Sequence, residues 1–144
     1  MTVKLIMSPR NRAAELSLDS IGEHFEKGIR AGFFAVGSQL RHTARLQMLE
    51  KKKGIKHANL RVRSSAVGET PASQTGKLRR SIGYQVSGDS MEFGAGGRGS
   101  GVNYALILEE DLARPLLVNS VKKNEAKIET LFNDAINKAL ESVS

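Results

Sequence analysis

The feature that most constrains the fold is a long run of apolar residues at helical spacing near the N-terminus. From Ser20 onward, apolar side chains recur every three or four residues and so fall on one stripe of an α-helix: Ile21, Phe25, Ile29, Phe33, Val36, Leu40 and Ala44. Ser20 and Glu23 have the spacing of a capping box at its start. We therefore expect one long helix that runs to about Lys52.

Three glycines, Gly28, Gly32 and Gly37, lie within this helix. Each costs about 1 kcal/mol relative to alanine in a helix interior. They favour close approach by another chain or a bend in the helix; alternatively, the helix simply tolerates them. The sequence leaves these interpretations open.

The middle of the chain predicts a small antiparallel sheet. Leu78, Ile82, Tyr84 and Val86 fit a strand over Leu78–Ser87 with one buried face. A turn at Ser87–Ser90 would lead into a return strand at Ser90–Phe93, and a third strand would follow at Val102–Leu108. Residues Val3–Met7 could add an edge strand, whose pairing nothing in the sequence fixes.

A second apolar stripe begins after Pro115 and predicts a C-terminal helix. Its members are Leu117, Val121, Ile128, Leu131, Phe132, Ala135, Ile136, Ala139 and Leu140. The order of elements predicts the α+β class, with a long N-terminal helix, a small antiparallel sheet and a C-terminal helix. A length of 144 residues is typical of a single domain, which we place at residues 1–144.

The positive charge is concentrated in the middle of the chain. The net charge is +7, and residues 41–80 contribute eleven Lys and Arg against Glu50 and Glu69, or 11 − 2 = +9. The remaining residues therefore sum to 7 − 9 = −2. The cations are Arg41, Arg45, Lys51, Lys52, Lys53, Lys56, Arg61, Arg63, Lys77, Arg79 and Arg80. Such a region attracts either nucleic-acid phosphate or an acidic protein surface.

Two segments are expected to be exposed and flexible. The first is a basic loop at about residues 54–77, rich in Ser, Gly and other turn formers. The second is a glycine-rich hairpin loop at residues 94–101, where Gly94, Gly96 and Gly99 have the spacing of a GxGxxG nucleotide motif. A nucleotide site also needs a helix after the glycines, and the residues after Gly101 favour a strand, so we expect no nucleotide binding.

The sequence offers no recognisable catalytic set. It has no cysteine, which excludes disulfides and thiol nucleophiles, and His24, His42 and His57 lie too far apart in sequence to share a metal on one helix. Glu109, Glu110 and Asp111 could approach Glu92 as metal ligands, but consecutive strand residues point to opposite faces. We expect no enzyme activity and no cofactor. We also expect no membrane span and no signal peptide.

Three motifs in order, PASQTGKLRRSI, NYALILEED and ARPLLVNSV, resemble those of the small head-tail joining or tail-completion proteins of long-tailed bacteriophages. The matching positions, which are structural in that family, are Thr75, Gly76, Leu78, Arg79, Ser81, Ile82, Tyr104, Ala105, Glu109, Pro115 and Leu116. The chain departs from the family pattern at Glu110 and Asp111, and at Asn119 and Ser120.

The resemblance implies a virion protein of the phage neck, made in the cytoplasm of the host bacterium. Such proteins form rings, commonly hexamers, between the connector or head-closure proteins and the tail tube. A tail-terminating ring and a head-closure ring are alternatives within the same neck. The residues that we expect to contact partners are Lys52, Lys53, Lys56, Arg61, Arg63 and Arg98.

An alternative of another class is a basic DNA-associated protein that uses the lysines from Lys51 to Lys56, with Arg61 and Arg63, on backbone phosphates. DNA that passes through a neck would also meet these side chains. A small basic toxin or nuclease is the least favoured alternative, because the sequence shows no acid and base pair to serve it.

Overall fold

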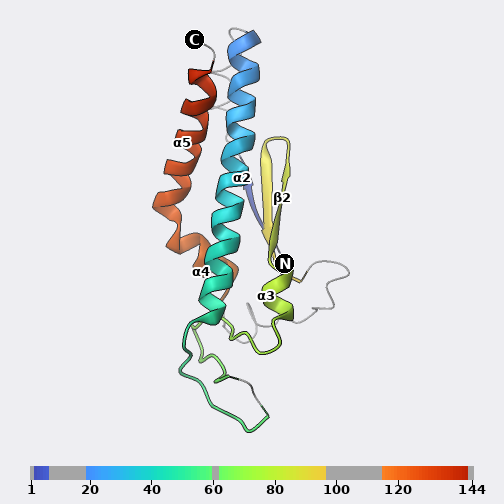
Figure 1. Cartoon of the computed structure of the whole chain (residues 1–144), viewed down its shortest axis with the longest axis vertical. Helices are drawn as coiled ribbons and strands as arrows, with labels where there is room; N and C mark the ends of the chain where they lie inside the picture. The colour runs from blue at the N-terminus through green and yellow to red at the C-terminus, as the bar shows by residue number, and fades with distance from the viewer. Residues whose placement is uncertain (1, 7–18, 60–61, 97–114, 143–144) are drawn as a thin grey trace.

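A computed structural model describes residues 2–6, 19–59, 62–96 and 115–142. The elements in chain order are β1 (Thr2–Ile6), α2 (Asp19–Leu49), α3 (Lys77–Ser81), β2 (Gly83–Ser87), β3 (Ser90–Gly94), α4 (Leu117–Lys123) and α5 (Glu125–Glu141). The long helix α2 lies between α5 on one side and the small sheet on the other (Figure 1). The predicted α+β class is confirmed, and none of the described helices is apolar over a length that could cross a bilayer.

Helix α2 carries the core on the predicted stripe. Ile29, Phe33, Val36, Leu40 and Ala44 are all buried, because their spacing keeps them on one face of the helix. The helix begins at Asp19, so Ser20 lies within it and not at the predicted capping position. It ends at Leu49, before the predicted Lys52, where the amide of Glu50 bonds the carbonyl oxygen of Gln47 at 3.3 Å, as in a tightened last turn.

The three helix glycines are contact points within the chain itself. A Cβ atom at Gly28 would lie 2.9 Å from the Cα of Ile136, and one at Gly32 would lie 2.5 Å from the ring of Phe132. A Cβ atom at Gly37 would overlap the ring of Tyr84 on β2. The close approach expected from these glycines is therefore made by α5 and β2, and neither a second chain nor simple tolerance is needed to explain them.

The sheet is antiparallel in the order β1-β3-β2. A turn with Gly88 at φ 56° joins β2 to β3 at the predicted place, and Ser90–Gly94 confirms the predicted return strand. The edge strand is confirmed as β1, whose Val3 pairs with Phe93. Val102–Leu108 lies outside the described residues; β3, from which the predicted hairpin would continue, has β1 and β2 on its two sides.

The strand predicted over Leu78–Ser87 is wrong in its first half. Residues Lys77–Ser81 form helix α3, and the strand begins only at Gly83. Leu78 and Ile82 are both buried, and a spacing of four fits one face of a helix as well as one face of a strand. The pattern was thus ambiguous at these positions.

The predicted C-terminal helix is two helices. The chain leaves helical geometry at Asn124, with φ −109° and ψ 9°, so that α4 ends at Lys123 and α5 begins at Glu125. Asn124 is buried and its side chain turns toward α2, which fixes the break in place. Packing of α5 on α2 includes an edge-to-face contact between Phe132 and Phe33, with ring centroids 4.8 Å apart.

Candidate functional site

The segment between α2 and α3 has no helix or strand in its described residues, 50–59 and 62–76, as expected for the predicted loop over residues 54–77. It is nevertheless joined by specific hydrogen bonds. The amide of Gly54 donates to the carbonyl oxygen of Ser64 at 3.0 Å, and the amide of Ser64 donates to that of Ile55 at 3.1 Å. The side chain of Gln74 bonds both the amide and the carbonyl of Val62, at 3.1 and 3.0 Å. These bonds give the loop a defined path, and its flexibility stays a prediction.

The carboxylate of Glu69 makes hydrogen bonds that hold this loop in place. Its Oε2 accepts hydrogen bonds from the amides of Ala66 at 2.7 Å and Lys53 at 3.1 Å. These two amide donors, with help from the nearby charges of Lys52 and Lys53, hold the pKa of the Glu69 carboxyl below its usual value. The ionised carboxylate therefore connects the end of the loop to its beginning.

The end of α2 and the loop that follows it together carry most of the exposed large apolar side chains of the described residues. Of seven such large side chains, five lie between residues 46 and 67: Leu46, Leu49, Ile55, Val62 and Val67. Ile55 is 66% exposed and Val67 is 76% exposed. We call these five residues, together with the exposed Lys51 and Lys53, the apolar-basic end of the molecule. Figure 1 shows the loop projecting from the end of α2 where α3 and α4 also lie.

The residues predicted to contact partners differ in how far they are exposed. Lys53, Lys56 and Arg63 are exposed, while Arg61 and Arg98 lie outside the described residues. Lys52 does not lie on the surface as expected of a partner contact. It is only 7% exposed, and its Nζ donates to the carbonyl oxygen of Gln47 at 2.6 Å. This carbonyl lies in the last turn of α2 and also accepts the amide of Glu50 at 3.3 Å, and it gives the buried ammonium a hydrogen-bond acceptor.

The residues of the first and third motifs help to build the core. Gly76, at φ 80°, precedes α3, and Leu78 and Ile82 are buried with Leu116 in one apolar cluster. The hydroxyl of Ser81 accepts a hydrogen bond from the amide of Gly96 at 2.9 Å. Pro115 and Leu116 lead into α4, and Arg79 is half-buried. Tyr104, Ala105 and Glu109 lie outside the described residues.

Part of the predicted basic region lies away from the loop. The guanidinium of Arg45 donates to the carbonyl oxygen of Ile82 at 3.0 Å, and Arg41 lies 5.2 Å from the ring centroid of Tyr84. Burial, followed by the charges of Arg41 and Arg79, lowers the pKa of Arg45. The Nε atoms of Arg45 and Arg79 are buried without a hydrogen-bond partner among the described residues. We call Arg41, Arg45 and Arg79 the arginine cluster. The ten cations of this region that the structure describes are thus divided between α2, α3 and the segment that joins them.

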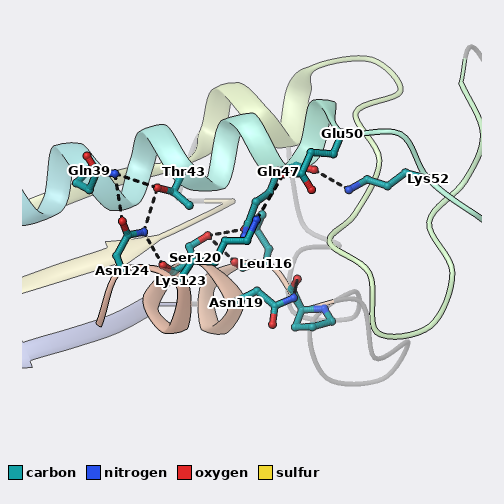
Figure 2. Close-up of polar contacts among 11 residues, drawn as sticks. Gln39, Thr43, Gln47, Glu50, Lys52, Leu116, Asn119, Ser120, Lys123 and Asn124 are labelled. Carbon is teal, nitrogen blue, oxygen red and sulfur yellow. Dashed lines mark hydrogen bonds and ion pairs between the residues drawn. The ribbon is translucent and has the colours of Figure 1, made fainter. Parts of the chain in front are cut away.

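A polar network joins α2 to α4 beside the loop (Figure 2). The side-chain amide of Asn124 donates to Thr43 Oγ1 at 3.0 Å and to the carbonyl oxygen of Ser120 at 2.8 Å, while its Oδ1 accepts from Gln39 at 3.1 Å. The Ser120 hydroxyl lies 3.1 Å from Gln47 Oε1. Buried polar groups that satisfy one another in this way fix the relative position of two helices.

Next to this network, α2, α4 and the loop line an open hollow of about 330 Å³. We call it the lysine hollow; it is lined by Gln47, Glu50, Lys51, Lys52, Gly68, Glu69, Thr70, Asn119, Lys122 and Lys123. The sequence alone did not single out Lys122 or Lys123 as residues of a site, or Asn124 as a residue of the network. A visible sign was the gap in the apolar stripe between Val121 and Ile128, where a continuous helix would place another apolar residue.

The histidines and carboxylates of the described residues do not form a metal site. No group of three or more metal-ligating side chains converges in residues 2–6, 19–59, 62–96 and 115–142. His24 is half-buried, and His42 and His57 are exposed. Glu92 is exposed on β3, and Glu110 and Asp111 lie outside the described residues.

No family model, no curated protein and no solved structure matches this chain.

Proposed function

We propose that this chain is a structural protein of the neck of a long-tailed phage, where it forms a ring that joins or completes the tail at the head-tail interface. Its partners are further copies of the chain, in a ring that is commonly a hexamer, with connector or head-closure proteins on one side and the tail tube on the other. A tail-terminating or head-closure ring is the same proposal with a different position in the neck. The proposal includes no cofactor, no catalysis and no membrane partner.

The observation that carries the proposal is the apolar-basic end. Five exposed apolar side chains gathered in and beside one loop are a surface that water solvates poorly, which is typical of a site that a protein partner covers. Lys51 and Lys53 are exposed in the same segment and would supply the polar rim that protein interfaces usually have. The motif resemblance adds support, since its residues at Thr75–Ile82 shape the corner where this loop returns to the core.

The first part of the test follows assembly in a phage that lacks the protein. Heads should still package DNA and tail tubes should still polymerise, because neither process needs this surface, but the two parts should fail to unite or the tails should end irregularly. Electron micrographs of lysates give the result directly. Fully assembled virions would contradict the proposal, and empty heads beside normal tails would replace it with a role in DNA packaging or retention.

The second part maps the function to the surface. The double variant Ile55→Asp with Val67→Asp should reproduce the assembly defect while the chain stays folded, because both side chains are largely exposed. Ala126→Asp, at an exposed position on α5, is the matched control and should support normal virions. Equal activity of all variants in complementation would remove the apolar-basic end from the proposal.

The DNA-associated alternative makes a different prediction for the purified chain. Its affinity for duplex DNA should fall by roughly 0.9 log units per log unit of salt for each phosphate contacted. A salt titration by fluorescence anisotropy distinguishes it, since apolar assembly contacts have no such dependence. The division of the cations between the arginine cluster and the loop favours the protein-contact interpretation.

A further inference from the structure

The lysine hollow has an unbalanced set of charges. Its lining contains four lysines and two glutamates, and both glutamates already have partners. Glu50 forms an ion pair with Lys123 at 3.5 Å, and Glu69 accepts two backbone amides. Lys51, Lys52 and Lys122 form no ion pair with a carboxylate in the described part of the chain. The hollow therefore holds a surplus of positive charge.

The burial of Lys52 makes this surplus of positive charge unfavourable for the stability of the fold. Its residue surface is almost wholly buried, and its ammonium group carries three donors, of which the carbonyl oxygen of Gln47 takes one. The charges of Glu50 and Glu69 favour the ionised form of Lys52, but its burial outweighs them, and an anion that entered the hollow would add a further favourable interaction. Burial also lowers the pKa of this lysine, in agreement with poor solvation of its charge.

The walls of the hollow are held in position before any ligand arrives. The polar network of Gln39, Thr43, Ser120 and Asn124 fixes α4 against α2, and Gln47 belongs both to this network and to the lining (Figure 2). The Glu69 carboxylate fixes the loop wall. Asn119 and Thr70 add polar groups that can bond to oxygen atoms. A site whose groups are already positioned loses little entropy on binding.

We propose that the lysine hollow binds a compact phosphate-type oxyanion, with Lys52 at its base and Lys51 and Lys122 at its rim. Lysine ammonium groups bind phosphate as point charges. A volume of about 330 Å³ admits a ligand the size of pyrophosphate and is far too small for a DNA duplex. The two glutamates of the lining also disfavour a long polyanion that would have to pass close to both of them.

The test measures binding of inorganic pyrophosphate to the purified full chain by calorimetry, with sodium chloride at equal ionic strength as the reference solution. Inorganic phosphate and acetate form two further arms, which separate phosphate chemistry from general attraction of any anion. We expect pyrophosphate to bind saturably and to raise the melting temperature above that in chloride. Lys52→Met and Lys122→Gln should each weaken binding about tenfold, as loss of a charge-assisted bond predicts.

Lys138→Gln, an exposed lysine on α5 away from the hollow, is the matched control and should bind as the unmodified chain does. Lys122 is exposed, so its variant keeps the test valid even if Lys52→Met does not fold. Unchanged affinity in Lys122→Gln, or a melting temperature that rises equally in chloride, would overturn the proposal. So would equal binding of acetate. The measurement uses no tail or head component, so its failure leaves the assembly proposal intact.

Discussion

At the scale of single residues, Asn124 decides how the C-terminal part of the chain is arranged. It is buried and uses its side chain for bonds to Gln39, Thr43 and the carbonyl of Ser120. These bonds occupy its two amide protons and its oxygen, so no polar atom of the side chain remains unsatisfied. A residue with this role is hard to replace, because any apolar substitute leaves partners on both helices without bonds.

We expect Asn124→Ala to lower the free energy of unfolding by about 1–3 kcal/mol, through the buried partners that lose their bonds. Asn133→Ala, at an exposed position on α5, is the control and should change it by no more than about 0.5 kcal/mol. Urea denaturation followed by circular dichroism measures both. Equal stability of the two variants would show that the network contributes little.

Lys52 gives the protein a pH dependence whose sign can be worked out. Burial lowers its pKa in the folded state below the usual 10.5 that it has in the unfolded chain. As the pH rises through the folded-state pKa, the folded protein releases this proton while the unfolded chain still holds it. The free energy of unfolding therefore rises across the window between the folded-state pKa and 10.5.

Lys52→Met should remove this contribution. The difference in unfolding free energy between the unmodified protein and the variant should shift in favour of the unmodified protein as the pH rises from about 7 to about 10. Lys51→Met, at an exposed neighbouring position, should show no such trend. Urea titrations at several pH values give the comparison. A flat difference for Lys52→Met would mean that its charge is well solvated.

At the scale of elements, the packing of α2 on α5 depends on close approach of the two backbones. Gly28 faces the Cα of Ile136, the carbonyl oxygen of Ala135 and the Cβ of Ala139, all within 3.3 Å of a Cβ built at this position. Gly32 instead faces the ring of Phe132. A backbone neighbour cannot move aside without moving its helix, whereas a side chain has other conformations.

Gly28→Ala should therefore destabilise the protein by about 1–3 kcal/mol, as overpacking of a close contact does. Helix propensity alone predicts the opposite, a gain of about 1 kcal/mol. Gly32→Ala should be less harmful, because the ring that it meets can rotate. Thermal unfolding of the two variants ranks them. A more stable Gly28→Ala protein would show that α5 has room to shift.

In the whole molecule, leucine side chains of α2 occupy two different environments. One leucine packs in the core and another lies on the surface. Leu40 is fully buried in the cluster shared by α2, the sheet and α4, whereas Leu46 is 49% exposed at the apolar-basic end. Leucine is apolar at both positions, so composition does not separate them. The two leucines differ only in the side of the helix on which each of them lies.

Leu40→Ala should cost about 2–5 kcal/mol and reduce the amount of folded protein. Leu46→Ala should leave stability within about 0.5 kcal/mol of the original. If the proposed neck function holds, Leu46→Ala should nevertheless reduce virion yield. Measuring unfolding and complementation on the same pair of variants separates folding from assembly. A large loss of stability in Leu46→Ala would place it in the core instead.

The elements with long, local residue patterns could be predicted from the residues alone. The helical stripe from Phe25 to Ala44 and the turn that joins β2 to β3 depend on neighbours close in sequence, so the residues there predict the structure directly. The exposure of part of the loop before α3 also follows from its composition, which is rich in turn formers, whereas the burial of Ser65 and Thr70 does not. These were the parts of the fold that sequence could predict.

Features that depend on partners far away in the sequence could not be predicted, because they form only when the chain folds. Leu78 and Ile82 fit a helix or a strand equally, and the partner of β1 is not encoded locally. Lys52 belongs to a run of three lysines that look alike in the sequence, yet it alone of the three is buried, because the carbonyl of Gln47 and the wall of α4 lie beside it. A count of charges in the sequence does not reveal the lysine hollow, because the hollow forms only where α2, α4 and the loop meet in space.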